Sequence, residues 1–370
     1  MTNWCAELIP PFPTPPLRRL TSRPQGDLEV AVRGKWVETI LYEIPLLVLV
    51  SECYFRFSDT DWNDDGQEER AYEKGVRLLS NGCVFSEFGT RRRRSYRTQE
   101  QVLLGLMRAA KDFSSSSSSP SPSSSTAGGG GGSASAGSLA GTSNVHFAHR
   151  FGLTPIGTVA HEWMMGIAAL TGAYRTANEV ALQQWFACFG TSLSIALTDT
   201  FGTPQFLQCF RKTCAAASPP RPYAEIFAGV RQDSGDPVEF VRLMRRFYDS
   251  VGVQDRKVVV FSDSLDVEKC LQYKQAAEAH GFATSFGVGT FLTNDFVHRS
   301  AAREGSKSIP LNIVIKIASV NGRPAVKISD NIGKNTGDEQ EVRRVKEELG
   351  YQEKQWEGGD EMWRWGGNRS

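Results

Sequence analysis

The sequence predicts an α/β protein whose strands close into a β/α barrel. From residue 155 onward, short apolar runs end in glycine or polar residues, and a helix-length amphipathic segment follows each of them. Such alternation indicates a parallel sheet with helices outside. The runs are IGTVAHEW, IALTDTFG, GVRQDSGDP, KVVVFSDSLD and TSFGVGT, and VFSEFGTR is a sixth. Six units favour a closed barrel; an open doubly wound sheet is the alternative, because sequence does not give strand order.

Composition excludes several classes of protein. The 370 residues are 40% hydrophobic, which suits one large or two ordinary domains, and the net charge of +1 recruits neither nucleic acid nor an anionic membrane. The longest apolar run, Ile44–Val50, is too short to span a bilayer. Seven cysteines without a Cys-x-x-Cys pair indicate neither a disulfide framework nor a zinc site. Because no secretory signal precedes Pro16, we expect a cytoplasmic protein, with the nucleus as an alternative.

The first third of the chain gives weaker signals. Residues 1–33 are rich in proline and arginine without a period, so we expect an extended or disordered lead. The run Trp36–Phe55 fits a buried helix interrupted by Pro45, and a polar turn and a helical segment follow it. Residues 114–138 are almost wholly serine, proline, glycine and alanine, which cannot bury enough apolar area to fold, so we expect a disordered insert.

An arginine run, Arg91–Arg94, follows the strand-like VFSEFGT. It is either a solvated or nuclear-targeting patch, or a strand end that presents arginine to a phosphate, whose oxygens match the guanidinium fork.

Further along, two helix boundaries are well marked. Asp236 is a cap residue followed by a first-turn proline and Glu239, and the helix that begins near Asp266 should stop at Gly281.

The carboxyl ends of parallel strands share one rim, where α/β enzymes place their chemistry. His161 lies directly after an apolar run and directly before a helical pattern. Position alone therefore favours equally a functional residue and a structural histidine that caps or borders a helix. The predicted rim holds Arg91, His161, Asp199, Thr200, Arg231, Asp233, Ser234, Asp263, Ser264, Gly287, Gly289 and Thr290.

This set of residues suits phosphate chemistry. Arginine and a glycine loop both bind phosphate oxygens. The carboxylates Asp199, Asp233 and Asp263 could hold Mg²⁺ through phosphates or bind ribose hydroxyls, and helix capping is the alternative for each. No metal-binding histidine motif and no Gly-x-Ser-x-Gly elbow is present. The residues alone therefore predict an enzyme that acts on a phosphorylated, sugar-containing substrate, with a histidine at the centre.

Several ordered motifs together resemble one family. They are EFGTRRR, GTSN, PIGTVAHEW, ALTDTFGT, VRQDSGDP, FSDSL and FGVGT, and the likeness extends through GKWVETILYEIPLL and KISDNIGKN over roughly residues 34–355. This pattern is similar to nicotinate phosphoribosyltransferases of the fungal type. The resemblance implies an irregular β/α barrel of the type II phosphoribosyltransferase kind with a smaller, incomplete α+β domain. The implied divisions are 1–33 (lead), 34–82 (remnant of the smaller domain), 83–310 (barrel) and 311–370 (C-terminal segment packing back on the smaller domain).

The resemblance also implies a reaction, in which nicotinate, 5-phosphoribosyl 1-diphosphate, ATP and water give nicotinate mononucleotide, diphosphate, ADP and phosphate. An enzyme of this kind is classed as a ligase, uses Mg²⁺ held through substrate phosphates rather than in a dedicated metal site, and forms a homodimer. His161 matches the histidine that ATP phosphorylates, Arg231 the arginine that meets the nicotinate carboxylate, and Arg91 one near the pyridine ring and phosphates.

Further positions carry over in the same way. Gly289 and Thr290 match the loop that wraps the 5′-phosphate of the product, and Asp233 or Asp263 could stabilise an oxocarbenium-like state by charge. The remaining implied substrate-binding positions are Ser143, Ser234 and Gly287.

The chain departs from the family pattern in two places. Residues 1–33 contain no TDxYK-like motif, whose aromatic residue reaches the nicotinate site of a partner subunit in the family, and the serine-glycine tract precedes GTSN where the family's connection is shorter. We therefore expect weak nicotinate binding. Two alternatives follow: an inactive homologue that acts as a dimerisation or regulatory partner, and a phosphoribosyl transfer to nicotinamide or quinolinate.

Overall fold

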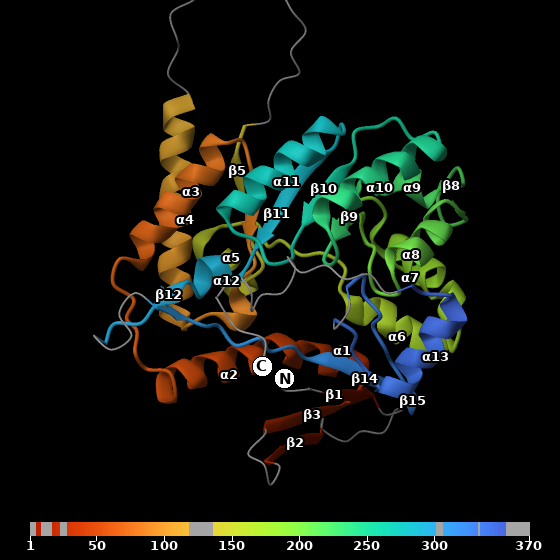
Figure 1. Ribbon diagram of the computed structural model, residues 1–370, viewed down its shortest axis with the longest axis horizontal. Coiled ribbons are helices and arrows are strands. Elements are labelled where there is room, and N and C mark those ends of the chain that lie inside the picture. Colours follow the sequence, from red (N-terminus) through yellow and green to blue (C-terminus); the bar gives the residue numbers. More distant parts are fainter. Residues whose placement is uncertain are drawn as a thin grey trace, which may run out of the picture.

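A six-stranded parallel sheet forms the centre of the computed structural model (Figure 1). Residues 28–117, 136–300, 306–331 and 334–352 are described, together with the strands at 5–8 and 17–22. The sheet has the order β5-β4-β11-β10-β9-β6, and every neighbouring pair is parallel. Its strands are β4 (Val84–Glu87), β5 (Ser138–Thr142), β6 (Ile195–Leu197), β9 (Gly229–Gln232), β10 (Val258–Phe261) and β11 (Ala283–Val288).

The strand order identifies the predicted barrel rather than a doubly wound sheet. From β6 to β11 each strand pairs with the next one in the sheet, and β11 pairs with β4, which comes first along the chain. A doubly wound sheet would instead reverse direction at a switch point. Among the described residues the cylinder is open between β5 and β6, where a single parallel bridge joins Thr142 to Pro155. The barrel is therefore irregular.

Helices cover the outside of the sheet, as the alternating pattern predicts (Figure 1). Asp236 caps one of them through Val238 N and Glu239 N, and Asp266 caps another, which Gly281 follows with a φ of +79°. Both predicted boundaries are confirmed. The covering helices are α3 (Gln67–Ser80), α4 (Tyr96–Ser117), α5 (Val145–Phe151), α6 (His161–Thr171), α7 (Tyr174–Phe189), α8 (Thr203–Phe210), α9 (Tyr223–Ile226), α10 (Pro237–Ser250), α11 (Val267–Ala279) and α12 (Thr290–Thr293), with a small hairpin of β7 (Thr213–Cys214) and β8 (Arg221–Pro222).

The main hydrophobic core lies between this sheet and its helices. Phe85, Phe261 and Phe286 come from three neighbouring strands and are fully buried, and the last two rings stack with centroids 5.6 Å apart. Each such side chain contributes about 1.5–3 kcal/mol when removed from water. A rigid core of this kind holds the strand ends, and the loops that follow them, in fixed positions.

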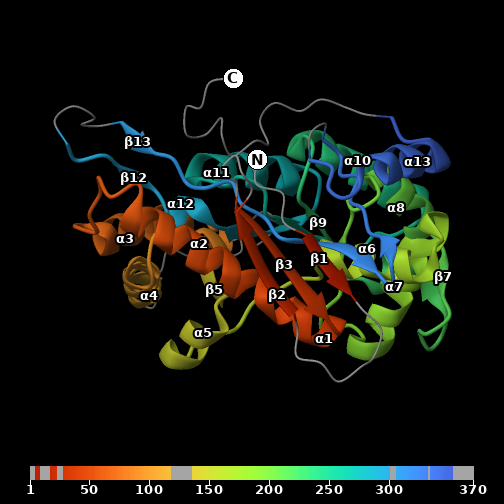
Figure 2. The same ribbon diagram turned by 90° about the horizontal axis from the view of Figure 1, so that it is seen from below.

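A second sheet joins the start of the chain to residues near its end (Figure 2). It has the order β15-β14-β1-β3-β2, in which β1 (Cys5–Leu8) pairs in parallel with both β14 (Lys316–Val320) and β3 (Leu28–Gly34). Antiparallel β2 (Leu17–Ser22) and β15 (Arg323–Pro324) form its edges.

Where these strands form, the predicted extended or disordered lead over residues 1–33 is extended and paired in a sheet, so only the disordered alternative is wrong there. The local signal was the alternation LEVAVR in β3, whose Val30 and Val32 are buried, but β14, the parallel partner of β1, comes from near the other end of the chain. The rest of that lead lies outside the described residues. The domain boundaries themselves stay a prediction.

The predicted buried helix after Lys35 is one helical stretch, α1 (Trp36–Thr39), η1 (Ile40–Tyr42) and α2 (Glu43–Phe57). Pro45 lies in the first turn of α2, where a missing N–H leaves no intrahelical bond unmade. One face is buried, but Val37, Leu41 and Phe57 are each more than 70% exposed. The prediction of burial is wrong for that face, because apolar residues occur all round the stretch and their spacing does not show which side is covered.

The remaining elements lie at the periphery. They are the hairpin of β12 (Phe296–Val297) and β13 (Lys307–Ser308) and the C-terminal helix α13 (Glu339–Leu349). Of the predicted disordered insert 114–138, residues up to 117 continue α4 and Ser138 begins β5, while residues 118–135 lie outside the described part of the chain. None of the helices described here has the length and apolar character that crossing a bilayer requires.

Candidate active site

Three of the four arginines that follow β4 are buried structural residues. Arg92 donates to the Ile313 carbonyl and to Asn312, and Arg93 pairs with Glu52 at 2.7 Å. Arg94 is fully buried over the Phe55 ring, and burial lowers its pKa to about 9. A solvated or targeting patch is therefore a wrong interpretation of this run.

Arg91 differs from these neighbours. The structure describes no hydrogen bond or ion pair for its guanidinium, and the side chain is partly exposed. Its positive charge is close enough to lower the pKa of Lys316 on β14, a shift whose larger cause is burial. Arg91 and Lys316 thus bring two cations to one region, from the barrel and from the second sheet.

A buried carboxylate organises the loops on either side of Arg91. Glu87, at the end of β4, accepts hydrogen bonds from Gly89 N at 2.5 Å, the Thr142 hydroxyl at 2.6 Å and the Gln99 amide at 2.9 Å. Burial raises its pKa despite these bonds. The Glu87 carbonyl also accepts from Ser143 N at 2.8 Å, so this residue fixes the predicted positions Arg91 and Ser143 relative to each other.

The predicted glycine loop follows β11. A Cβ on Gly287 would lie 2.6 Å from the Phe88 ring, so glycine is required there for close packing. Gly289 lies beside the Phe88 carbonyl, and buried Thr290 begins α12. Phe88 is a partly exposed aromatic residue between the two predicted loops, and the sequence analysis did not single it out.

His161 begins helix α6 and is 5% exposed. The sequence predicts a strand directly before His161, and this prediction is wrong. The segment forms only the bridge at Pro155. The Nε2 atom of His161 lies 2.8 Å from Asp199 Oδ1 and 3.6 Å from Asp233 Oδ2. Burial and the charge of Lys327 lower the pKa of His161 to about 4, so the imidazole is neutral at pH 7.

Asp199 is the most connected carboxylate of the site. Its Oδ2 accepts from the Ser234 hydroxyl at 2.7 Å and lies 3.3 Å from Lys327 Nζ. Burial opposes ionisation, but Lys327 and His161 outweigh it and hold the pKa of Asp199 well below its usual value. Because an ionised carboxylate only accepts hydrogen bonds, Nε2 of His161 must be the donor.

Arg231 and Asp233 extend this network along β9. Arg231 donates to Asp233 Oδ1, the Ser262 hydroxyl and the Thr158 hydroxyl, each at 2.8 Å. Although burial opposes it, the Arg231 charge keeps the pKa of Asp233 low. His161, Asp199, Arg231, Asp233 and Ser234 therefore form one connected group, as the shared rim predicts.

Asp263 belongs to a neighbouring ion pair. Its Oδ2 lies 2.7 Å from Lys334 Nζ, and this partner raises the pKa of Lys334 although burial opposes the shift. The structure thus brings Lys327, Asp330 and Lys334 to the barrel mouth, none of which sequence reasoning assigned to the site. All three residues belong to the motif KISDNIGKN, and its resemblance to the family was the available signal.

The carboxylates are poorly suited to a dedicated metal cage. One ligand atom each of His161, Asp199 and Asp233 lies within 4.8 Å of the others. However, both Asp199 oxygens are engaged by His161, Ser234 and Lys327, and Asp233 Oδ1 by Arg231. A cation would have to displace these bonds, so this donor set fits Mg²⁺ only when substrate phosphates supply ligands.

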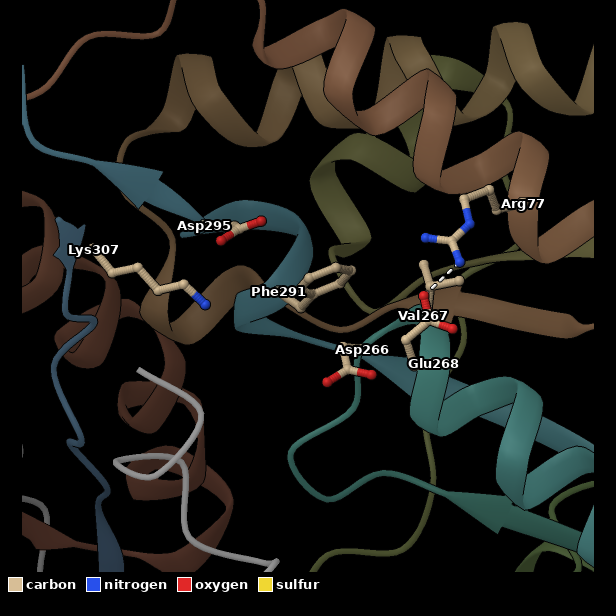
Figure 3. A pocket seen from close by; sticks show the side chains of 7 residues that line it. All are labelled: Arg77, Asp266, Val267, Glu268, Phe291, Asp295 and Lys307. Carbon is tan, nitrogen blue, oxygen red and sulfur yellow. Dashed lines mark hydrogen bonds and ion pairs between the residues drawn. The ribbon is translucent and has the colours of Figure 1, made fainter. Parts of the chain in front are cut away.

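A cavity of about 230 Å³ is lined by residues of α3, the start of α11, α12 and β13 (Figure 3). Its charged residues are largely matched, since Arg77 pairs with Glu268 and Asp295 with Lys74. It contains none of the predicted site residues, and we assign it no chemistry. The lining residues are Arg77, Asp266, Val267, Glu268, Phe291, Asp295 and Lys307.

Comparisons with known proteins place the chain in one family. The model of the nicotinate phosphoribosyltransferase (NAPRTase) family matches residues 83–353. The chain is 46% identical over 341 residues to a nicotinate phosphoribosyltransferase of Saccharomyces cerevisiae, covering 91% of this chain and 73% of that one. A crystal structure from the same yeast superposes with a TM-score of 0.79 at 44% identity, over 91% and 76% of the two chains. A nicotinate phosphoribosyltransferase structure from Vibrio cholerae gives 0.75 at 33% identity, over 91% and 73%.

Proposed function

The chain belongs to the nicotinate phosphoribosyltransferase family, and we propose that it couples ATP hydrolysis to the joining of nicotinate and 5-phosphoribosyl 1-diphosphate. The products are nicotinate mononucleotide, diphosphate, ADP and phosphate, so the enzyme would be classed as a ligase. The observation that carries this proposal is the buried, neutral His161, oriented by Asp199 beside Arg231 and Asp233.

His161 is the proposed phosphoryl acceptor. Its Nε2–H donates to Asp199, so the lone pair is on Nδ1. Attack by Nδ1 on the γ-phosphorus of ATP forms a P–N bond and breaks the bond to the bridging oxygen, and ADP leaves with the electron pair. Asp199 balances the positive charge that develops on the ring, and Lys327 offsets negative charge nearby.

Arg231, Arg91 and Phe88 suit a pyridine carboxylate. An arginine pairs with the carboxylate of nicotinate and loses that pair with nicotinamide. Phe88 offers a ring face for stacking next to the loop of Gly287 and Gly289.

The other charged residues suit the ribosyl transfer. Asp233 or Asp263 would stabilise the oxocarbenium-like state by charge. When bound, Mg²⁺ neutralises the leaving diphosphate. The cations Lys327 and Lys334 would lie close to the same phosphates. Backbone N–H groups around Gly287, Gly289 and Thr290, and the hydroxyl of Ser143, are the proposed donors to the ribose 5′-phosphate. Ser234 would act on the substrate site through Asp199, to which its hydroxyl donates.

A second copy of the chain is the proposed partner. The helical stretch α1–η1–α2 exposes Val37, Leu41 and Phe57, and it runs along one side of the barrel, beside the second sheet (Figure 1). Covering such side chains is what a stable dimer interface does. We place the protein in the cytoplasm, or alternatively the nucleus, where exposed thiols such as Cys53 and Cys188 stay reduced.

Labelling with γ-³²P ATP tests the proposal. The wild-type protein should acquire an acid-labile phosphate, and His161→Ala should acquire none, whereas the surface variant His149→Ala should label normally. Nicotinate mononucleotide formation should require Mg²⁺ and stop on addition of EDTA. Label that persists in His161→Ala would show that another residue is the phosphoryl acceptor. Faster turnover of nicotinamide or quinolinate than of nicotinate would contradict the proposed substrate.

A further inference from the structure

Asp330 supplies the helix cap that α8 lacks in its own sequence. Helix α8 begins at Thr203 after Gly202, which has no side chain to accept the first N–H groups. The Asp330 carboxylate accepts hydrogen bonds from Thr203 N at 2.7 Å and from the Thr203 hydroxyl. A residue from the C-terminal part of the chain therefore caps a helix that starts 127 positions earlier.

The backbone around Asp330 is held from two sides. Ser329 has a φ of +69°, which a residue with a side chain rarely adopts unless its neighbours enforce it. The Tyr351 hydroxyl donates to the Ser329 carbonyl at 2.6 Å, and the Tyr351 ring fills the space beside Gly202. On the other side, a Cβ on Gly235 would lie 3.4 Å from the Asp330 Cβ. The position of the Asp330 backbone is therefore tightly constrained.

The backbone N–H of Asp330 begins a chain of hydrogen bonds to His161. It donates to the Ser234 hydroxyl at 3.0 Å, and that hydroxyl donates to Asp199 Oδ2 at 2.7 Å. The other Asp199 oxygen accepts from Nε2 of His161 at 2.8 Å. A serine hydroxyl has a single hydrogen, so accepting from Asp330 N leaves that hydrogen directed at Asp199.

We infer that Asp330 is a positioning residue for His161, acting through Ser234 and Asp199. By capping α8, the Asp330 side chain adds to the contacts that hold its own backbone N–H, which orients Ser234 and so holds the Asp199 carboxylate against the imidazole. The inference rests on the proposed role of His161 and extends it to a residue that does not touch the substrate. A purely structural cap would stabilise α8 and leave His161 unchanged.

The charge state of Asp330 offers a second means of testing this role. Burial, and then the negative charge of Asp199, raise the pKa of Asp330 to about 7, while Lys327 acts in the opposite direction. Protonation removes accepting capacity from the carboxyl, so the cap should weaken as the pH falls through 7. Labelling of His161 should then decline on the acidic side of pH 7 in the wild type, and this decline should be absent in Asp330→Asn.

The main test compares Asp330→Ala and Asp330→Asn with Asp338→Ala. Asp338 is a matched control, because it caps α13 through Gln340 N and Glu341 N and lies outside the site. Asp330→Ala should slow phosphorylation of His161 by about 10- to 100-fold, as loss of an orienting partner does elsewhere. Asp330→Asn retains one acceptor oxygen, so its labelling rate should lie between those of the wild type and Asp330→Ala. Asp338→Ala should label at the wild-type rate. Thermal melting shows which variants are folded.

A double-mutant cycle with Ser234→Ala separates positioning from general destabilisation. If Asp330 acts through Ser234, adding Asp330→Ala to Ser234→Ala should change the labelling rate by less than about twofold. Losses that multiply across the two sites would overturn the inference.

The ¹⁵N resonance of His161 tests positioning without any need for catalytic activity, so its result holds even if the proposed function is wrong. With ¹⁵N-histidine labelling the chain gives signals from only five histidines, and His161→Gln identifies the one of interest. Asp330→Ala should move the His161 Nε2 resonance, and Asp338→Ala should not. A wild type that never labels would refute phosphoryl transfer while leaving this comparison valid; an unmoved resonance in folded Asp330→Ala would refute positioning.

Discussion

Replacing Asp199 by asparagine tests the geometry of the site most directly. Asp199 Oδ1 lies 2.8 Å from His161 Nε2, and its ionised state requires Nε2 to carry the hydrogen. An asparagine can turn its NH₂ group toward Nε2, which then accepts, so the ring hydrogen moves to Nδ1. The proposed nucleophilic nitrogen loses its lone pair in that tautomer.

The expected effect is large. Fixing the wrong histidine tautomer in this way costs about 10⁴-fold in a serine protease, and we expect Asp199→Asn to slow labelling of His161 by about 10²- to 10⁴-fold, or about 3–5 kcal/mol. The substitution also leaves Lys327, 8% exposed, without its carboxylate at 3.3 Å. Breaking such a buried pair destabilises a fold by about 3–5 kcal/mol.

Two further variants separate these effects. Asp199→Asn combined with Lys327→Met removes the stranded charge and should recover most of the melting temperature without recovering labelling. Asp249→Asn makes the same chemical change in a surface pair with Arg245, where Asp249 is 56% exposed, and should alter neither property. Labelling of folded Asp199→Asn within about threefold of wild type would refute the tautomer argument.

Three other predictions follow from contacts in and around the site. Glu87→Ala strands three buried donors and should lower the free energy of unfolding by about 3–5 kcal/mol in urea titrations; a loss below about 1 kcal/mol contradicts the role of Glu87. Burial and Glu43 raise the pKa of Glu162 to about 7 from a model-compound value of 4.5, so the native state keeps this proton longer than the unfolded chain. Ionisation of Glu162 should therefore lower the free energy of unfolding by up to about 3 kcal/mol as the pH rises from about 4.5 to 7. Glu162→Gln, which can still accept from Trp36, should not show this loss. Identical plots of unfolding free energy against pH for the two proteins would exclude the raised pKa. Arg231→Lys has no guanidinium fork and should reduce the preference for nicotinate over nicotinamide by about 10- to 100-fold in kcat/KM, and an unchanged ratio would assign carboxylate recognition elsewhere.

The fold was predictable where the signals are local. The cap at Asp236, the stop at Gly281 and the strands β4, β6, β9, β10 and β11 depend on a few neighbouring residues, and the structure has them as predicted, whereas the apolar run before His161 forms only a bridge. The strand at 5–8 was missed because it pairs with β3 and with β14, which is remote in sequence, whereas the strand at 17–22 pairs locally with β3 and carries no clear alternation of its own. A strand without its partner exposes unpaired N–H groups, so its stability is a property of the sheet.

The site was predictable in part for the same reason. His161, Arg231 and Asp233 follow or lie on successive elements of the barrel, and parallel strands bring such positions together. Lys327 and Asp330 come from an irregular segment with no period, which returns to the barrel mouth from far along the chain. Nothing in their local sequence distinguishes a lysine beside Asp199 from a lysine in solvent.

The arginine run shows how far sequence reasoning reaches. The sequence by itself determined the residue types at the barrel mouth, the strand and helix alternation that brings them there, and the family motifs that they form. Only the tertiary structure decided that Arg92, Arg93 and Arg94 are buried in packing while Arg91 is available, and that His161 is neutral with Nε2 as its donor. Burial, charge separation and hydrogen-bond direction depend on distances between residues that are remote in sequence, and those distances exist only once the chain has folded.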